Sequence, residues 1–591
     1  MFTTRPEILG SFGCVGSTHW LASATAMAVL ERGGNAFDAA VAAGFVLQIV
    51  EPHLNGPGGE VPILLVTAKS GKPQAICGQG PAPAGATIAH YRGLGLDMVP
   101  GSGLLATCVP GAFDAWLLLL RDYGTMKLAD VMSYAISYAE NGYPLVPRIV
   151  DQIDAVRQMF EDEWVTSAEL YLAAGLPKPF SLFRNRELAK TYSRIVGDAE
   201  AAGGNREKQI DAARHIWSQG FIAETIDAFC RTSDVMDSSG RRHRGVLTGA
   251  DMAKWQASVE APSSFDYHGL TVFKCGVWSQ GPVFLQQLAL LKNFDLAAMD
   301  PLGVEFVHTV TECSKLAFAD REAYYGDPNF VDVPLTQLLD DEYNRERSRL
   351  VSERASAELR PGKIKGHDGR IIIPEEAETD AEATKRQRAA GGGEPTVKRG
   401  DTCHLDIVDR WGNMVSATPS GGWLHSSPII PGLGFCLGSR AQMFWLEPGL
   451  PASLAPGKRP RTTLSPNLAF RQGKPHMAFG TPGGDYQDQW SLVFFLRHVH
   501  HGMNLQESID APMFHNDHMP SSFWPRTWQP ASLTAENRLP EKTLAALRRK
   551  GHRLNVTDAW SQGRLAAVAQ ADGMLKAGAN PRGMQGYAQG R

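Results

Sequence analysis

The spacing of apolar residues changes along this chain of 591 residues. In the first two thirds, apolar positions recur at helical intervals over long stretches, which predicts helices over residues 21–32, 35–50, 112–141 and 306–325. Gly33 and Gly34 suit the left-handed conformation that closes a helix, and Asn35 can cap the next one. A Pro/Gly-rich turn at 51–59 leads into an apolar strand at 61–66, and residues 142–258 are mixed in character.

The last third has short stretches in which apolar and polar residues alternate, as in strands. Residues 402–408 and 413–418 are expected to form a hairpin around Gly412, and residues 467–470 and 476–480 a second one. An amphipathic helix should follow at 487–501. Helices early and antiparallel strands late favour a layered α/β protein.

The segment 363–400 differs from both regions. It contains an acidic run, a basic run and three consecutive glycines, with few apolar residues. This composition predicts a flexible linker. The mixed signs of charge argue against a nucleic-acid-binding tail.

Directly after the linker stands Asp401-Thr402-Cys403-His404-Leu405. A threonine hydroxyl is a weak nucleophile unless a base lies beside it. The α-amine of Thr402 itself would be such a base, with a pKa near 7.7–8.0 in a typical chain, if the bond between 401 and 402 were cut. A β-branched residue opening a strand is also common without any such role. Cys403 should point to the opposite face of the strand, which argues against a catalytic thiol there.

Other motifs decide between these readings. The Thr402 segment is similar to the Thr-Thr-His-aromatic motif of the γ-glutamyltransferase family of N-terminal-nucleophile hydrolases, in which the first Thr is the nucleophile. Further stretches resemble that family in the same order along the chain: residues 33–40, 51–53, 315–321, 409–413, 456–466 and 480–484. The resemblance covers nearly the whole chain and implies a four-layer αββα sandwich built from two fragments of one precursor.

The resemblance also implies roles for individual residues. Gly483 and Gly484 precede the helix at 487, where backbone N–H groups can stabilise an oxyanion, although a plain strand-to-helix turn would look the same. Ser420 falls where the family has a second Thr that hydrogen-bonds the nucleophile, and a generic turn serine is the alternative. Thr462 and Thr463 replace paired serines that hold the substrate's α-carboxylate.

Two positions depart from the family pattern. Gln79 stands about where the family has an arginine that clamps the substrate carboxylate, and an amide cannot supply that charge. Met443 takes the approximate place of an aspartate that binds the substrate ammonium, with no carboxylate nearby in sequence before Glu447. Ordinary γ-glutamyl substrates should therefore bind poorly. Arg440 is a candidate replacement for the carboxylate contact, and a surface arginine or one bonded to backbone carbonyls is the alternative.

Composition narrows the remaining possibilities. A hydrophobic content of 43%, a charged content of 20% and a net charge of −4 are typical of a soluble globular protein and give no reason to expect nucleic acid or membrane as a partner. The N-terminus lacks the apolar core of a signal peptide, which predicts a cytoplasmic protein. The eight cysteines include no Cys-x-x-Cys pair, so buried, reduced thiols are expected. His498, His500 and His501 lie on different helix faces, so neither a metal nor a cofactor is predicted.

The resulting hypothesis is an amidohydrolase that cleaves itself between Asp401 and Thr402. A large fragment (1–401) and a small fragment (402–591) would fold as one unit and associate as a heterodimer, with further dimerisation left open. The substrate would be a small-molecule amide or an acyl side chain, as for family members described as cephalosporin acylases or oxamate amidohydrolases. A γ-glutamyltransferase acting on glutathione, and an inert scaffold of the same fold, remain the alternatives.

Overall fold

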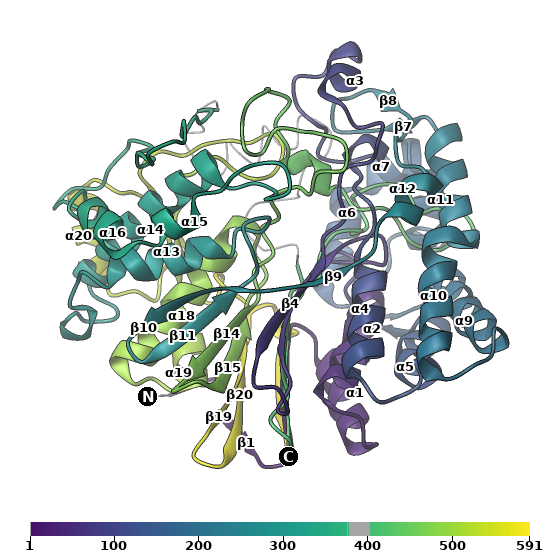
Figure 1. Ribbon diagram of the computed structural model, residues 1–591, viewed down its shortest axis with the longest axis horizontal. Coiled ribbons are helices and arrows are strands. Elements are labelled where there is room, and N and C mark those ends of the chain that lie inside the picture. Colours follow the sequence, from purple (N-terminus) through teal and green to yellow (C-terminus); the bar gives the residue numbers. More distant parts are fainter. Residues whose placement is uncertain (1, 375, 377–401) are drawn as a thin grey trace.

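Two seven-stranded sheets face each other at the centre of the molecule, with helices on both outer sides (Figure 1). The computed structural model describes residues 2–374, 376 and 402–591. The layers run helix, sheet, sheet, helix, which is the predicted αββα sandwich. Both chain ends lie at the lower edge of the view in Figure 1.

The first sheet, called sheet 1, contains the strand that follows Thr402. All its neighbouring strands pair antiparallel, and Leu405 to Val408 of β12 align with Ala417 to Met414 of β13. Its strands in spatial order are β21 (Tyr587–Gly590), β2 (Gly13–Ser17), β12 (Leu405–Asp409), β13 (Met414–Ala417), β3 (Val61–Val66), β4 (Pro73–Gly78) and β9 (Ser258–Glu260).

The second sheet, called sheet 2, is also antiparallel throughout. Its strands in spatial order are β1 (Ile8–Gly10), β20 (Met574–Ala579), β19 (Ala566–Ala571), β15 (Lys474–Gly480), β14 (Asn467–Arg471), β11 (Leu270–Lys274) and β10 (Ser263–Tyr267). Each sheet thus combines strands from before and after Thr402. The two segments build common sheets rather than separate domains.

Helices cover the outer face of each sheet (Figure 1). Those on the side of sheet 1 are α1 (Trp20–Glu31), α2 (Ala36–Val50), α4 (Ala112–Tyr123), α5 (Leu128–Asn141), α9 (Arg186–Ala201), α10 (Arg206–Gln219) and α11 (Phe221–Thr232). Those on the side of sheet 2 are α13 (Pro282–Leu291), α14 (Val304–Tyr324), α16 (Asp341–Ser348), α18 (Gln487–His501), α19 (Leu505–Asp510) and α20 (Glu541–Lys550). A small third sheet joins β16 (Phe514–His515), β17 (Ser532–Glu536) and β18 (Arg553–Thr557).

Apolar side chains fill the three spaces between the four layers. One cluster packs α1, α2 and α4 against sheet 1, and another packs α13, α14 and α18 against sheet 2. A third lies between the sheets and includes Leu64, Val408, Leu468 and Val568. Helices cover the outer face of each sheet, and the two sheets cover each other's inner face. Side chains on both faces of the strands are therefore mostly buried.

Several predicted elements are confirmed. The helix at 487–501 is α18, and α2 begins after Asn35, whose side chain accepts bonds from the N–H groups of Phe37 and Asp38. The predicted stretch 112–141 is two helices, because Gly124 ends α4. The predicted strand from Thr402 is shorter than expected and begins at Leu405, with Thr402 in a single bridge.

The predicted linker at 363–400 is described only in its first part. Ile364 is buried, and Arg370 pairs with Glu447 at 2.8 Å. Residues 363–374 therefore pack against the rest of the protein. The remainder of the predicted linker, apart from Glu376, lies outside the described residues, as does Asp401. Within the described ranges, no helix is both long and apolar enough to cross a membrane. All eight cysteines are buried.

Candidate active site

Thr402 lies just ahead of β12, with only 3% of its surface exposed. It forms an antiparallel bridge with Ser420, which follows β13. Its hydroxyl donates to Ser420 Oγ over 3.2 Å. The two residues predicted to interact are therefore in contact.

Cys403 points to a different set of partners. Its thiol donates to Glu51 Oε2 at 2.9 Å and accepts from Asn55 Nδ2 at 3.1 Å. Burial and the nearby Glu51 carboxylate raise the pKa of Cys403 well above its ordinary value. A thiolate is thus disfavoured, in agreement with the prediction that Cys403 is not the nucleophile.

Ser420 is held from its other side by Glu60 and Arg440. Glu60 N–H donates to Ser420 O at 2.9 Å, and Ser420 N–H donates to Glu60 O at 3.0 Å. Arg440 Nη2 donates to Ser420 Oγ at 3.0 Å, while its Nε donates to Glu60 Oε1 at 2.6 Å. Both charged side chains are almost fully buried.

Three apolar side chains surround the Arg440 guanidinium and form a small cluster of their own: Trp423, Met443 and Phe523. The guanidinium carbon lies 5.5 Å from the Trp423 ring centre and 5.8 Å from that of Phe523. These are distances at which a cation is attracted to an aromatic face. The cluster buries the guanidinium beside Ser420.

The glycine turn, Gly483-Gly484, lies at the start of a 3₁₀ turn (Gly484–Tyr486) that runs into α18. Gly483 has φ = 129° and Gly484 has φ = 51°, conformations that favour glycine. A Cβ on Gly484 would lie 2.8 Å from the Phe523 ring. Phe523 therefore contacts the glycine turn and also belongs to the apolar cluster around Arg440. It connects the predicted oxyanion donors with the Thr402 side of the site.

A buried polar network supports the glycine turn. Gln280 Nε2 donates to Gly484 O at 3.2 Å, and Arg321 Nη1 donates to both Gln280 Oε1 (2.7 Å) and Asp485 Oδ1 (2.6 Å). Burial alone would raise the pKa of Asp485, but Arg321 and the bonds from Ser522 outweigh it and lower that pKa. Asp485 therefore stays ionised and holds the turn.

Thr462 and Thr463 lie on the glycine-turn side of the site. Thr462 N–H donates to Trp278 O at 3.0 Å, and Gln280 N–H donates to Thr462 O at 2.8 Å. Both threonines are buried, and Thr463 Oγ1 has no hydrogen-bond partner among the described residues. That hydroxyl is consistent with a group that meets a ligand.

Gln79 lies at the end of β4 and is fully buried. Its Nε2 donates to Gly80 O at 3.0 Å, and its Oε1 has no partner in the described part of the chain. No hydrogen bond between described residues joins it to Thr402 or Ser420.

The structure contradicts both alternatives considered for Arg440. Arg440 is neither a surface residue nor one bonded to backbone carbonyls, because it is buried in a pair with Glu60. Met443 has no carboxylate near it in sequence before Glu447, but in space Glu60 is close, since it bonds Arg440, whose Nη1 lies 3.8 Å from Met443 Sδ. Sequence reasoning missed Glu60 and Phe523. The only hint was an acidic residue at the end of the Pro/Gly-rich turn, next to an apolar strand.

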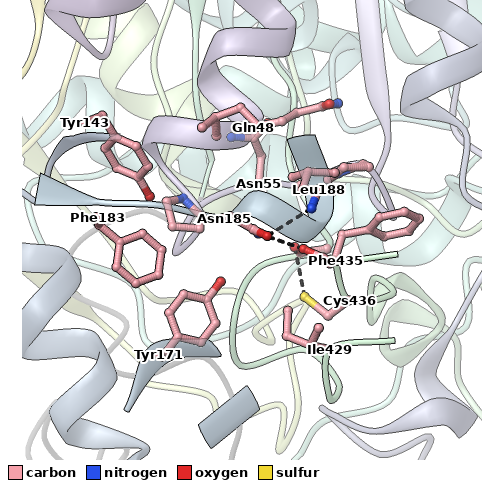
Figure 2. Close-up of a pocket in the computed structure, with 16 residues that line it drawn as sticks. Gln48, Asn55, Tyr143, Tyr171, Phe183, Asn185, Leu188, Ile429, Phe435 and Cys436 are labelled. Atoms are coloured by element: carbon pink, nitrogen blue, oxygen red, sulfur yellow. Dashed lines mark hydrogen bonds between the residues drawn. The ribbon is translucent and has the colours of Figure 1, made fainter. Parts of the chain in front are cut away.

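Two cavities lined by described residues differ in size. One, of about 20 Å³, lies behind Gly422 and is lined by Gln48, Asn55, Tyr171 and others (Figure 2). It has room for about one water molecule and is too small for a substrate. The other, of about 560 Å³, is open and is lined by Glu260, Trp278 and Phe330, among others. Trp278 connects this cavity to Thr462, whose N–H donates to Trp278 O. The cavity volume is in the range of small-molecule sites.

Among the described residues, one group has donor atoms close enough to share a metal ion: His308, Glu312 and His552. Lys315 already donates to Glu312 at 2.6 Å, and a buried ammonium there opposes binding of a second cation. Two of the histidines considered above as metal ligands bond different groups. His498 bonds Met503 O, and His500 bonds the Tyr267 hydroxyl.

The family model described as gamma-glutamyltranspeptidase matches residues 22–590. The chain belongs to the γ-glutamyltranspeptidase family. It is therefore an enzyme of the family's hydrolase and acylase group, as the resemblance implied. Curated relatives at 27–30% identity are named as glutathione hydrolase, acylase and oxamate amidohydrolase proenzymes.

Three similar proteins illustrate the range of this family. The "Glutathione hydrolase-like YwrD proenzyme" of Bacillus subtilis is 30% identical, with 98% of each chain covered. A solved structure titled "Structure of LmbA2991HD" is 55% identical over the full length of both chains, with a TM-score of 0.94. The cephalosporin acylase from Bacillus halodurans is 26% identical, covering 100% of this chain and 98% of its own, with a TM-score of 0.83. These γ-glutamyltranspeptidase relatives confirm the four-layer fold.

Proposed function

We propose that this γ-glutamyltranspeptidase-family enzyme is a self-processing amidohydrolase whose nucleophile is Thr402. The observation that carries the proposal is the contact of the Thr402 hydroxyl with Ser420 at 3.2 Å. Arg440 and Phe523 connect this pair to the glycine turn. Cleavage before Thr402 would create an α-amine next to the hydroxyl. That amine would take the hydroxyl proton as the oxygen attacks an amide carbon.

The remaining residues would act in sequence. Backbone N–H groups of Gly483 and Gly484 would stabilise the oxyanion, a contribution of about 2.7–4 kcal/mol per donor. Collapse of this intermediate would release the amine product and leave an ester on Thr402. Water would then hydrolyse the ester and free the acid. Among the described residues, the Thr463 hydroxyl has no hydrogen-bond partner and Arg440 Nη1 has no oxygen partner, and both groups would contact the acyl group.

The substrate would be a small amide or an acyl side chain other than free γ-glutamyl. Gln79 has no charge to offer a carboxylate, and Arg440 is already neutralised by Glu60. A zwitterionic γ-glutamyl group would thus lose part of its hydration without full compensation. Relatives named as an acylase and an oxamate amidohydrolase share this fold and family.

A direct assay separates this proposal from its main alternative, a true γ-glutamyltransferase. Wild-type enzyme is tested on γ-glutamyl-p-nitroanilide with and without glycylglycine, and on oxamate, glutaryl amides and glutathione. We expect hydrolysis of at least one non-γ-glutamyl amide and no stimulation by glycylglycine. Strong transfer of the γ-glutamyl group to glycylglycine would overturn the substrate assignment. An intact chain inactive on every probe would favour an inert scaffold.

Two further parts of the proposal follow from self-cleavage. The fragments 1–401 and 402–591 would stay together as a heterodimer, because each sheet contains strands from both. The cytoplasmic location expected from the sequence stays a prediction.

A further inference from the structure

Glu60 is tied to the nucleophile's hydrogen-bond partner in three ways. Its main chain exchanges two hydrogen bonds with Ser420, and its carboxylate binds Arg440, which in turn donates to Ser420 Oγ. Ser420 meanwhile bridges to Thr402. Thr402, Ser420 and Glu60 therefore lie side by side on three adjacent segments, with Arg440 closing the group.

The hydrogen bonds at Ser420 Oγ have a defined direction. The oxygen accepts one from the Thr402 hydroxyl and one from Arg440 Nη2, which occupies both of its acceptor positions. A guanidinium bonded to a hydroxyl oxygen makes that hydroxyl a stronger donor. Arg440 therefore acts on the Thr402 hydroxyl through the Ser420 hydroxyl.

The chain makes specific room for the Glu60 carboxylate. Gly421 has φ = 75°, and a Cβ at this position would lie 2.6 Å from Glu60 Oε2. A larger residue at 421 would thus be strained and would also displace the carboxylate. Burying an arginine–carboxylate pair generally brings little net stability, because both ions lose their hydration. Its place beside Ser420 therefore points to a role in the site.

We propose that Glu60 is a positioning residue: it holds and neutralises Arg440, and so sets the charge that the α-amine and hydroxyl of Thr402 experience. This inference rests on the proposed function of Thr402. The path from Thr402 Oγ through Ser420 Oγ to Arg440 Nη2 has steps of 3.2 and 3.0 Å. At such a separation an unbalanced guanidinium has a marked effect on a neighbouring amine.

Other ionisable groups surround this region and are the same in every variant considered. Cys108 packs against the Glu60–Arg440 pair, and Glu51 lies behind Cys403. His404, just before β12, pairs with Asp406 on β12. On the glycine-turn side, Asp485 binds Arg321.

The test measures the pKa of the Thr402 α-amine without needing a substrate. Purified wild type, Glu60→Gln and the double variant Glu60→Gln/Arg440→Met are labelled with trace acetic anhydride across pH 5–10. Mass spectrometry then quantifies acetylation of the peptide that starts at Thr402. Circular dichroism and the presence of both fragments verify folding. Glu536→Gln is the matched control, because it breaks a buried pair with Arg582 and, among the described residues, Glu536 has no hydrogen bond to Thr402, Ser420 or Arg440.

We expect Glu60→Gln to lower the amine pKa by about 0.5–1 unit, because it leaves Arg440 positive and unbalanced. The double variant, with neither charge, should return to within about 0.3 unit of wild type, as should Glu536→Gln. Equal pKa values in Glu60→Gln and the double variant would overturn the inference. If wild type has no chain that starts at Thr402, the proposed function itself fails and this inference falls with it.

Discussion

The site has two polar sides that are built differently. The Thr402 side has one arginine, Arg440, matched by one carboxylate, Glu60. The glycine-turn side combines Arg321 and Arg461 with Glu322 and Asp485, and Arg526 adds a further positive charge nearby. The first side touches the Thr402–Ser420 hydroxyl pair directly. The second touches the glycine turn through its backbone and Gln280.

This difference fits the two tasks in the proposed reaction. Beside the nucleophile, the Glu60–Arg440 pair has no net charge, and a net charge there would shift the pKa of the Thr402 α-amine. Around the turn, an excess of positive charge favours the oxyanion that forms there. The first prediction below removes the group that both sides serve, and the later ones perturb single sides with progressively smaller effects.

Thr402→Ala removes the one group on which both sides act. We expect an uncleaved chain of full length and a loss of activity of at least about 10³-fold, since no other group can form the ester. The measurement is a denaturing gel together with hydrolysis of the best amide probe. Thr543→Ala, which removes a buried hydroxyl bonded to Leu302 O, should leave both unchanged. Full activity in Thr402→Ala would mean another nucleophile.

Gly484→Ala perturbs the glycine turn alone. The added Cβ would meet Phe523 and strain a backbone with φ = 51°, so the N–H donors should move. We expect kcat to fall about 100-fold while self-cleavage still exposes Thr402. Gly502→Ala is the control, because Gly502 has φ = 64° but open space around its Cβ. A similar fall in both variants would assign the effect to backbone strain in general.

Asp485→Asn weakens the network behind the turn. Arg321 keeps Glu322 but loses its second carboxylate, and breaking a buried pair typically costs about 3 kcal/mol of stability. We expect a lower thermal midpoint and a kcat reduced about tenfold with little change in KM. Asp320→Asn breaks a comparable buried pair with Arg347, and among the described residues the Asp320 carboxylate has no bond to the glycine turn. It should lower the midpoint but not kcat, and equal kcat losses would contradict the assignment.

The smallest expected effect is a difference in how acid affects the two sides. The pKa of Asp485 is lowered, so its stabilisation holds above the ordinary carboxyl pKa and fades as pH falls through the lowered value. Burial raises the pKa of Glu60 despite Arg440, so its contribution increases as pH falls through that raised value. Thermal midpoints from pH 7 to pH 3 should therefore drop less in Asp485→Asn, and more in Glu60→Gln, than in wild type. Identical slopes would contradict the two pKa directions.

The sequence predicted the parts of the fold that depend on local patterns. Helix α18 and the Asn35 cap follow from apolar spacing and capping chemistry, and both are confirmed. Alternation along an extended chain also predicted that the Cys403 and Thr402 side chains point to opposite sides, and they bond different partners. Glu60 was missed because its partner Arg440 lies 380 residues away, and no local pattern encodes such a pair. Phe523 was missed for the same reason, since it reaches the glycine turn from a loop with no regular spacing.

The central claim is that Thr402 becomes the first residue of a new chain. Intact-mass and N-terminal sequencing of active, purified enzyme test it most directly. We expect two polypeptides, 1–401 and 402–591, with Thr402 at the start of the smaller. Active enzyme that remains one uncut chain, or that is cut elsewhere, would contradict it.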